Sequence, residues 1–246
     1  MALSGSRWVR PSSAAEAAGL AAAGATLLGG GALLMSSAFP AVPATVVVDL
    51  DSLQLDYLAA PEIGAQVRLE SLLASAAIRQ GWPAIWTAVA EIASPNVRRL
   101  ATVGGTVGAA LPGSDLLVAL CASGARVHLA GADGASRLLP VHRYLTERPP
   151  GVVTGLHLGD QARGGYRRLG GRPVPAPAVV TVAAVEHRGQ VDVWVGGIGP
   201  VPQPLRTGGR RGDVDCAGDA AWPAAYRLRV MDALYGDLLS SLAVTA

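Results

Sequence analysis

The sequence predicts an α+β fold, in which a mixed α/β region precedes a small α+β domain with an antiparallel sheet and a closing helix. Up to about residue 160, short apolar strand patterns alternate with helical patterns. From Gly164 onward, three strand patterns follow one another with only turns between them. The chain has 246 residues, of which 50% are hydrophobic and 15% charged, so we expect it to bury a substantial core.

The first helix is predicted over residues 11–24, a segment rich in alanine and bounded by start and stop signals. Ser13 and Glu16 have the spacing of a capping box, and Gly24 is a natural C-terminal stop. The next four residues, ATLL at 25–28, predict a short strand.

A glycine loop is predicted after this strand, at GGGALLM (29–35), where it runs into an apolar, helix-like turn. ATVVVDL at 44–50 is β-branched and continuous, which predicts a strand buried on both faces. IGAQVRL at 63–69 predicts a further strand, and helical patterns follow at 68–81 and 82–93.

The stretch ATVGGTVGAALPGSD at 101–115 consists mostly of small residues and predicts a loop between helices. The helix that follows is predicted over 114–124. Ser114 is its N-cap, Asp115 lies in its first turn, and Gly124 is its C-cap.

Three further strand patterns complete the first region. They lie at ARVHLAG (125–131), at SRLLPVHRYL (136–145), which turns into a short helix, and at GVVTGLHLG (151–159). The texture of the sequence changes between Gly159 and Gly164, and we expect a domain boundary there.

The last region predicts a small antiparallel sheet followed by a helix. Its strand patterns are GGYRRLGGR (164–172), PAVVTVAAVEHRG (177–189) and QVDVWVGGIG (190–199). The apolar periodicity of 221–243 predicts a closing amphipathic helix, with Gly236 as a candidate break point.

Composition excludes several classes of function. The formal net charge of +2 gives no electrostatic case for nucleic acid, and the absence of lysine removes a Schiff-base residue. Cys121 and Cys216 belong to no cluster, so zinc and iron–sulfur ligation within this chain are not expected.

Targeting signals are also weak. SSAFPA at 36–41 resembles a cleavage site, but Glu16 interrupts the apolar run that follows Arg7 and Arg10, so we expect no signal peptide. No uninterrupted apolar run approaches the roughly 20 residues that span a bilayer. A cytoplasmic protein without membrane attachment is therefore expected.

Residues that commonly carry catalysis lack the necessary context. Ser114 does not sit in a GxSxG elbow, so a hydrolase is not expected. The four histidines have no metal-ligand spacing, and we expect them to be structural or exposed; they are His128, His142, His157 and His187. The sequence therefore predicts no catalytic residue and no metal ligand.

The glycine loops are the best candidates for a binding site. At Gly29–Ala32 and Thr102–Thr106, glycines allow close backbone approach, and successive N–H groups form a nest for a pyrophosphate. The threonine hydroxyls can bond phosphate or ribityl oxygens, and Asp115 can accept from sugar hydroxyls. Taken alone, the glycine triplet is better explained by an ordinary tight turn, because it matches neither the P-loop nor the GxGxxG pattern.

Five segments carry a family resemblance. The most specific is ASPNVRRLATVGGTVGAALPGSDLLVALCASGARVHLAG at 93–131. The others are WVRPSSAAEAAGLAAAGATLLGGGALL at 8–34 with IGAQVRLESLL at 63–73, GGYRRLGGR at 164–172 and AAYRLRVMDALYGDLL at 224–239. In these segments the chain resembles the FAD-binding subunits of molybdenum hydroxylases, which include the carbon monoxide dehydrogenase medium subunit and the xanthine dehydrogenase FAD domain.

The resemblance implies a domain plan and a cofactor site. An FAD-binding domain is expected over residues 1–160, with subdomains at about 1–55 and 56–160, followed by a C-terminal flavoprotein domain over 161–246. FAD is expected in the cleft between the two domains. The implied cofactor-binding residues are Leu28, Gly29, Gly30, Gly31, Ala32, Thr102, Val103, Gly104, Gly105, Thr106, Asp115, Tyr166 and Arg168.

The sequence departs from the family pattern at the first loop. That loop commonly reads Ala-Gly-Gly-Thr-Asp, whereas Gly31 and Ala32 stand here in place of the two polar residues. The asparagine usual after the second glycine pair is Thr106. Two possible side-chain hydrogen bonds to the cofactor are thereby lost.

The resemblance further implies an oxidoreductase subunit that works with partners. Electrons would come from an iron–sulfur small subunit and a molybdopterin large subunit, and FAD would pass them to NAD or another acceptor. Two alternatives stay open: a degenerate scaffold of the same fold that binds no flavin, and a stand-alone flavoenzyme of another pathway.

Overall fold

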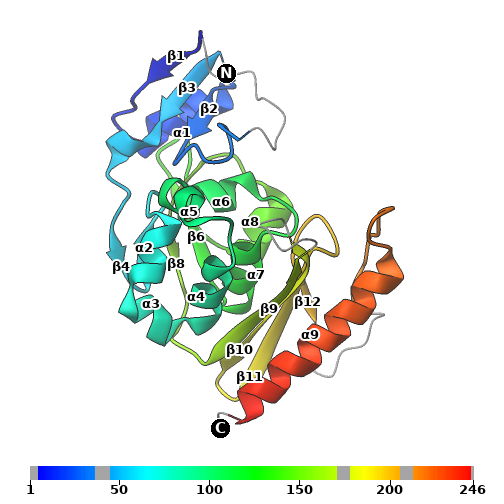
Figure 1. Cartoon of the computed structure of the whole chain (residues 1–246). Coiled ribbons are helices and arrows are strands. Elements are labelled where there is room, and N and C mark those ends of the chain that lie inside the picture. Colours follow the sequence, from blue (N-terminus) through cyan, green and yellow to red (C-terminus); the bar gives the residue numbers. More distant parts are fainter. Residues whose placement is uncertain (1–4, 37–44, 171–177, 206–212, 245–246) are drawn as a thin grey trace. The chain divides into compact units, whose positions relative to one another are not determined.

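The computed structural model describes residues 5–36, 45–170, 178–205 and 213–244 (Figure 1). It confirms the predicted α+β class, because helices combine with antiparallel sheets. Residues 37–41 of the cleavage-like stretch and residues 206–212 of the arginine-rich segment RTGGRRGD (206–213) lie outside the described residues. None of the helices in the described segments is both long and apolar enough to cross a membrane.

The chain forms two compact units, each assembled from three segments. Unit 1 contains Met1–Ser71, Pro95–Ala109 and Arg126–His157. Unit 2 contains Leu72–Ser94, Ala110–Ala125 and Leu158–Ala246. The expected domains at 1–160 and 161–246 follow chain order rather than compactness, and they stay a prediction.

A three-stranded parallel sheet lies in unit 1, in the order β1 (Arg7–Val9), β3 (Val46–Asp49), β2 (Thr26–Leu28). The central position of β3 confirms the prediction of a strand buried on both faces, and both Val47 and Val48 are fully buried. Strand β1 was not predicted, because three residues are too short to show a period.

Helix α1 (Ala14–Ala22) packs beside this sheet (Figure 1) and confirms the first predicted helix. The Ser13 side chain accepts a hydrogen bond from the Glu16 amide at 3.1 Å. The Glu16 carboxylate in turn accepts from the Ser12 amide at 2.8 Å. These reciprocal bonds satisfy two amides at the helix start.

The second sheet of unit 1 has five antiparallel strands in the order β4-β5-β8-β6-β7. Its apolar face is fully buried where Ile63, Leu156 and Val127 lie on neighbouring strands. The predicted strand at 63–69 is shorter, because pairing with β8 stops at Gly64. The bounds are β4 Leu58–Ala59, β5 Glu62–Gly64, β6 Arg126–Ala130, β7 Ser136–Pro140 and β8 Val152–His157.

The helix predicted over 68–81 is divided into α2 (Leu69–Ala74) and α3 (Ala76–Gly81). The break lies at Ser75, whose side chain accepts from the Ile78 amide at 3.3 Å and so caps α3. The next predicted helix is confirmed as α4 (Pro83–Ala90), with Pro83 at its first position.

The loop prediction at 101–115 is wrong over residues 103–109, nearly half of its length. Residues Val103–Ala109 form helix α6, and Pro95–Leu100 form α5 before it. The predicted helix after Ser114 is confirmed as α7 (Asp115–Ala122). The turn after Ser136–Pro140 is helix α8 (Val141–Glu147), as predicted, and a short 3-10 helix covers Leu50–Leu53.

Unit 2 is built on an antiparallel sheet in the order β12-β11-β10-β9. The predicted sheet is confirmed by β9 (Gly164–Gly170), β10 (Ala178–His187) and β11 (Gln190–Gly196). Strand β12 (Gln203–Leu205) was not predicted, because Pro204 interrupts its pattern.

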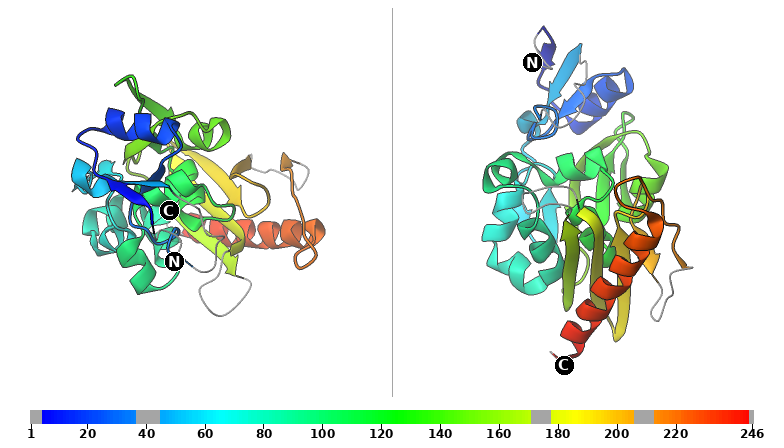
Figure 2. Two further views of the ribbon diagram at one scale, coloured as in Figure 1. Left: turned by 90° about the horizontal axis from the view of Figure 1, so that it is seen from above. Right: turned by 45° about the vertical axis from the view of Figure 1, so that its right-hand side comes forward.

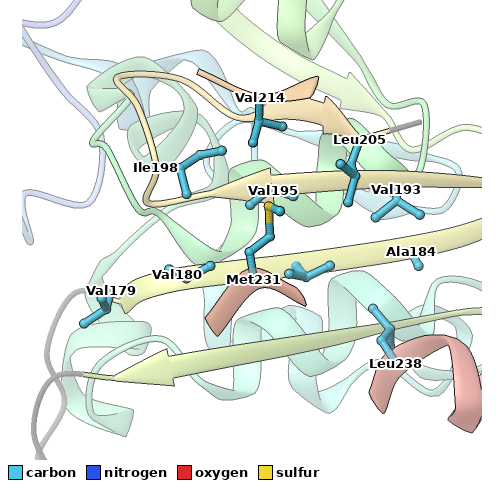
Figure 3. Packing of buried hydrophobic residues seen from close by; sticks show 11 residues of the cluster. Val179, Val180, Ala184, Val193, Val195, Ile198, Leu205, Val214, Met231 and Leu238 are labelled. Atoms are coloured by element: carbon cyan, nitrogen blue, oxygen red, sulfur yellow. The ribbon is translucent and has the colours of Figure 1, made fainter. Parts of the chain in front are cut away.

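Helix α9 (Ala224–Val244) lies along one face of this sheet (Figure 2) and runs unbroken through Gly236. A single glycine costs a helix only about 0.5–1 kcal/mol relative to alanine, and the packing of α9 on β9 and β10 offsets that cost. Met231 of α9 points toward Val195 in the core (Figure 3). Helices α4 and α7 pack against the sheet as well, α4 mainly on β9 and α7 on β10 and β11.

Candidate functional site

Three segments of unit 1 meet where the two glycine motifs lie. The segment Ala65–Leu69 runs antiparallel to Ala101–Gly104, beside helix α6. Three backbone bonds hold them: Leu69 N to Ala101 O (2.9 Å), Val103 N to Val67 O (2.9 Å) and Gly104 N to Ala65 O (2.8 Å). The first glycine motif, Gly29–Ala32, lies against both segments.

Side chains of the Ala65–Leu69 segment alternate between two sides. Ala65, Val67 and Leu69 are buried to 3% exposure or less. Gln66 and Arg68 point the other way, toward the glycine motif. A Cβ placed on Gly29 would lie 3.5 Å from Gln66 Oε1, and one on Gly30 would lie 2.5 Å from Arg68 Nη1.

The first glycine motif approaches its neighbours too closely for side chains. A Cβ on Gly30 would overlap the carbonyl oxygen of Leu100, and one on Gly29 would come within 2.8 Å of Thr102 Oγ1. Gly31 has φ +73°, in the left-handed region that favours glycine. Gly29 and Gly30 are therefore packed against Thr102 and Leu100 in a way that only glycine permits, and we call this stretch of backbone the cradle.

The second motif caps and begins α6 instead of forming a loop. Thr102 Oγ1 accepts a hydrogen bond from the Gly105 amide at 3.1 Å, which is the N-cap arrangement. The Thr106 hydroxyl donates to the Thr102 carbonyl at 2.9 Å. The hydrogen of the Thr106 hydroxyl is thus already used, whereas Thr102 keeps its own hydrogen for another acceptor.

The two glycines of this motif serve different contacts. A Cβ on Gly104 would lie 2.5 Å from Ala65 Cβ and 2.9 Å from Ala65 O, so this glycine lets α6 pack on the neighbouring segment. Gly105 instead faces the first motif, because its Cα lies 3.8 Å from the Cβ position of Gly29.

Arg68 is the charged group nearest the cradle. Its Nη1 donates to the carbonyl oxygen of Leu100 at 2.6 Å, which satisfies an acceptor at the C-terminal end of α5. Its Nη2 lies 3.8 Å from Asp51 Oδ1, beyond hydrogen-bond distance. The Arg68 side chain is 34% exposed, so its positive charge is accessible at the edge of the cradle.

Gln66 is a buried polar group without partners. It is 4% exposed, and among the described residues neither Oε1 nor Nε2 of its amide has a hydrogen-bond partner. Leaving a buried donor or acceptor unpaired costs about 1–3 kcal/mol. Such a group beside a glycine cradle indicates a place where a polar ligand completes the structure.

The other expected residues come together in unit 2. Asp115 opens α7, and Tyr166 and Arg168 lie two residues apart on β9, on one face of the strand. The Tyr166 hydroxyl donates to Asp115 Oδ1, and Arg168 Nε lies 3.3 Å from the same oxygen. Arg168 also donates through Nη1 to the carbonyl oxygen of Glu91 at 3.0 Å.

Burial has the largest effect on the pKa values of Asp115 and Tyr166. Burial raises the pKa of Asp115 from 3.8 to about 6, although the Tyr166 hydrogen bond and the Arg168 charge oppose that shift. Burial and the neighbouring Asp115 carboxylate raise the pKa of Tyr166 well above its usual value. Tyr166 is 2% exposed, so the structure shows it joining β9 to α7. Its expected place near a flavin stays a prediction.

Comparison with known proteins decides the family. Residues 4–155 match the family described as the FAD binding domain in molybdopterin dehydrogenase, which is more than half of the chain. The chain belongs to this family. FAD is therefore its cofactor, and the sequence resemblance to the FAD-binding subunits of molybdenum hydroxylases is confirmed.

Solved structures share the fold of this FAD-binding chain. CO dehydrogenase from Oligotropha carboxidovorans matches with a TM-score of 0.85 and 21% identity over 98% of both chains. A carbon monoxide dehydrogenase from Hydrogenophaga pseudoflava that lacks the Mo-pyranopterin moiety matches at 0.83 and 19% over 97% of both chains. Quinoline 2-oxidoreductase from Pseudomonas putida 86 matches at 0.81 and 17% over 98% of both chains. No curated protein sequence matches the chain.

The unit 1 site fits a phosphate-bearing cofactor such as FAD. The cradle carries no side chain at Gly29 and Gly30, and the Gln66 amide beside it is buried without a partner among the described residues. The exposed charge of Arg68 suits an anion. An apolar ligand would leave the Gln66 amide unpaired and would not interact with the Arg68 charge.

Neither Gln66 nor Arg68 was among the residues expected from the sequence. The signal that marks them is the alternation Ala-Gln-Val-Arg-Leu at 65–69, which predicts a strand with one polar face. Polar residues at every second position of such a strand are candidates for contact with a ligand.

Two of the histidines share one carboxylate in the five-stranded sheet of unit 1. Glu62 Oε2 lies 2.8 Å from His128 Nε2, and Glu62 Oε1 lies 2.6 Å from His157 Nδ1. These contacts link β5 to β6 and β8. Across the described segments, no group of three or more His, Cys, Asp or Glu is placed to hold a metal ion. The Glu62 carboxylate thus joins three strands of the sheet.

Proposed function

We propose that this chain is the FAD-binding electron-transfer subunit of a molybdenum hydroxylase-type oxidoreductase. It would take electrons from iron–sulfur clusters of a partner and pass them through FAD to an external acceptor. The observation that carries the proposal is the buried, unpartnered amide of Gln66 beside the glycine cradle, in a chain of an FAD-binding family.

The residues of unit 1 would hold the phosphate-bearing part of the cofactor. Gly29, Gly30 and Gly31 would offer their backbone, and Leu28 and Ala32 flank them. Thr102 would donate its hydroxyl hydrogen, while Gly105 keeps the approach open. Val103, Gly104 and Thr106 would act through the shape of α6, because Gly104 packs on Ala65 and the Thr106 hydroxyl bonds within the helix.

In unit 2, Asp115, Tyr166 and Arg168 would form the second binding group. The Asp115 carboxylate meets Tyr166 and Arg168 through Oδ1, and it would also accept a hydrogen bond from a sugar hydroxyl. Arg168 holds the carboxylate in place through its charge and through its bond to the Glu91 carbonyl.

FAD, when bound, supplies the ability to accept and release electrons, and the chain itself supplies binding and orientation. Iron–sulfur ligands would have to come from a partner, because the chain has only two cysteines, Cys121 and Cys216. Burial raises the pKa of Cys121 to about 12, which keeps it protonated and unsuited to ligation. The partners would be an iron–sulfur subunit and a molybdopterin subunit, with NAD or another electron acceptor.

Cofactor content and co-purification test the proposal. The purified chain should show the flavin absorbance bands, or gain them on incubation with FAD, and should co-purify with an iron–sulfur partner. A chain that stays colourless with added FAD is the degenerate scaffold, and this result overturns the proposal. An FAD-containing chain that is active alone, without an iron–sulfur partner, is a stand-alone flavoenzyme.

Gly105→Val tests the second glycine motif within that experiment. Its Cβ would come within 2.8 Å of Thr102 Oγ1, on the side facing the cradle, so FAD retention should be lost while the circular dichroism spectrum is kept. Gly104→Val is a poorer test, because the packing against Ala65 would be disrupted with or without FAD. Full FAD retention by a folded Gly105→Val variant would contradict the proposed site.

A further inference from the structure

We infer that Arg68 and Gln66 form a third cofactor-binding element, outside both glycine motifs. Arg68 supplies the positive charge that faces the phosphates of FAD, and Gln66 supplies a buried amide that hydrogen-bonds the cofactor. The inference rests on the proposed binding of FAD in unit 1, and it assigns roles to residues on the Ala65–Leu69 segment.

The Arg68 guanidinium lies beside the first glycine motif. Its Nη1 lies 2.5 Å from where a Cβ on Gly30 would be, so the guanidinium packs directly against Gly30, next to the carbonyl oxygen of Leu100. The chain contains no lysine, so only arginine provides a permanent side-chain cation. A diphosphate lying on the cradle would therefore lie beside this charge.

The guanidinium is oriented and still has donors left. One N–H is bonded to Leu100 O at 2.6 Å, which fixes the plane of the fork. A guanidinium has five N–H donors, and the Asp51 carboxylate at 3.8 Å from Nη2 is too far to take one by a hydrogen bond. The remaining donors suit phosphate oxygens, which arginine binds through two parallel bonds.

Gln66 supplies the second, independent observation. Its amide is 4% exposed and unpartnered among the described residues, and its Oε1 lies 3.5 Å from the Cβ position of Gly29. The chain bears the cost of that amide in the absence of ligand, although an apolar side chain of similar size would avoid it. A bound cofactor offers both the donor and the acceptor that the amide lacks.

A purely structural role for Arg68 makes a different prediction. As a cap on the α5 carbonyl of Leu100, Arg68 would contribute to stability with or without FAD. It would not make FAD affinity depend on ionic strength. A charge that faces a diphosphate does create that dependence, because salt screens the attraction.

The main test measures FAD affinity of the whole chain by flavin fluorescence at low and high salt. Arg68→Gln should weaken binding about 10- to 100-fold at low salt and flatten the salt dependence. Arg68→Lys should lose affinity but keep the salt dependence. Arg137→Gln is the matched control, because Arg137 is an exposed unit 1 arginine on β7 that also bonds a carbonyl, Pro150 O, at 3.4 Å. It should bind FAD like the wild type.

Two further variants should change FAD affinity in opposite directions. Asp51→Asn removes the carboxylate that competes for Arg68, so FAD affinity should rise a few-fold. Gln66→Met keeps the side-chain volume but removes the unpartnered amide. The FAD-free chain should then unfold at a higher temperature, while FAD binds at least about tenfold more weakly.

The outcomes separate this inference from the proposed function. A wild-type chain that binds no FAD overturns both. A wild-type chain that binds FAD, with an Arg68→Gln variant of equal affinity and equal salt dependence, overturns only the assignment of Arg68. A Gln66→Met variant with lower stability and unchanged FAD affinity overturns the assignment of Gln66.

Discussion

Two glycines on the same helix should respond in opposite ways to replacement by alanine. Gly104 and Gly108 both lie in α6, four residues apart. A Cβ on Gly108 would meet nothing within 4 Å. A Cβ on Gly104 would lie 2.5 Å from Ala65 Cβ, about 1 Å closer than ordinary van der Waals contact. The comparison therefore separates helix propensity from packing.

The magnitudes follow from these distances. Gly108→Ala should stabilise the chain by about 0.5–1 kcal/mol, because alanine loses less backbone freedom in a helix. Gly104→Ala gains the same amount but overpacks the contact, at about 1–3 kcal/mol. It also weakens the Gly104 N–H bond to Ala65 O, for about 1 kcal/mol more. The net result is a loss of about 1–3 kcal/mol.

Thermal unfolding of the FAD-free chain, followed by far-UV circular dichroism, measures the difference. For a chain of this size the two variants should be separated by roughly 5–15 °C, with the wild type between them. Because the chain has two units, the transition that reports unit 1 is the one to compare. A Gly104→Ala variant as stable as Gly108→Ala would refute the packing explanation of the second glycine motif.

Three further predictions concern protonation and capping. Because folding raises the Asp115 pKa from 3.8 to about 6, its contribution of about 3 kcal/mol is complete below pH 4 and lost as pH rises through 6. Urea titrations should show this pH dependence in the wild type and not in Asp115→Asn. Burial opposes ionisation of Glu62, but hydrogen bonds from His157 and His128 prevail and lower its pKa. Glu62→Gln should therefore lower the melting temperature at pH 7 by the equivalent of about 1 kcal/mol or less, and the deficit should vanish in acid. Thr102→Val should cost about 0.5–2 kcal/mol by urea titration, whereas Thr102→Ser should be nearly neutral.

Residue periodicity predicted most of the elements, because burial on one face leaves a direct trace in the sequence. The alternation of β6 and the continuous apolar run of β3 are examples. Glycine content misled the prediction at 101–109, because low helix propensity was overridden by tertiary contacts. There, Gly104 gives α6 the close approach to Ala65 that holds the helix in place.

The site was predictable only in part. The glycine motifs were visible in the sequence, because close packing at Gly29 and Gly30 leaves no room for a side chain. Gln66 and Arg68 were not singled out, because nothing local to a sequence shows that a polar residue is buried and unpartnered. The grouping of Asp115 with Tyr166 depends on a contact across 51 positions, which local patterns do not reveal.

The interleaved order of the two units has a consequence for synthesis on the ribosome. Every residue of α7 is buried, and α7 packs on β10 and β11. The helix ends at Ala122, yet β10 begins only at Ala178. At ribosomal rates of about 5–20 residues per second, roughly 3–10 seconds pass between the synthesis of Ala122 and that of Ala178. During that interval the nascent chain carries an apolar helix that a chaperone must shield, so soluble yield should depend on chaperone supply before any cofactor is needed.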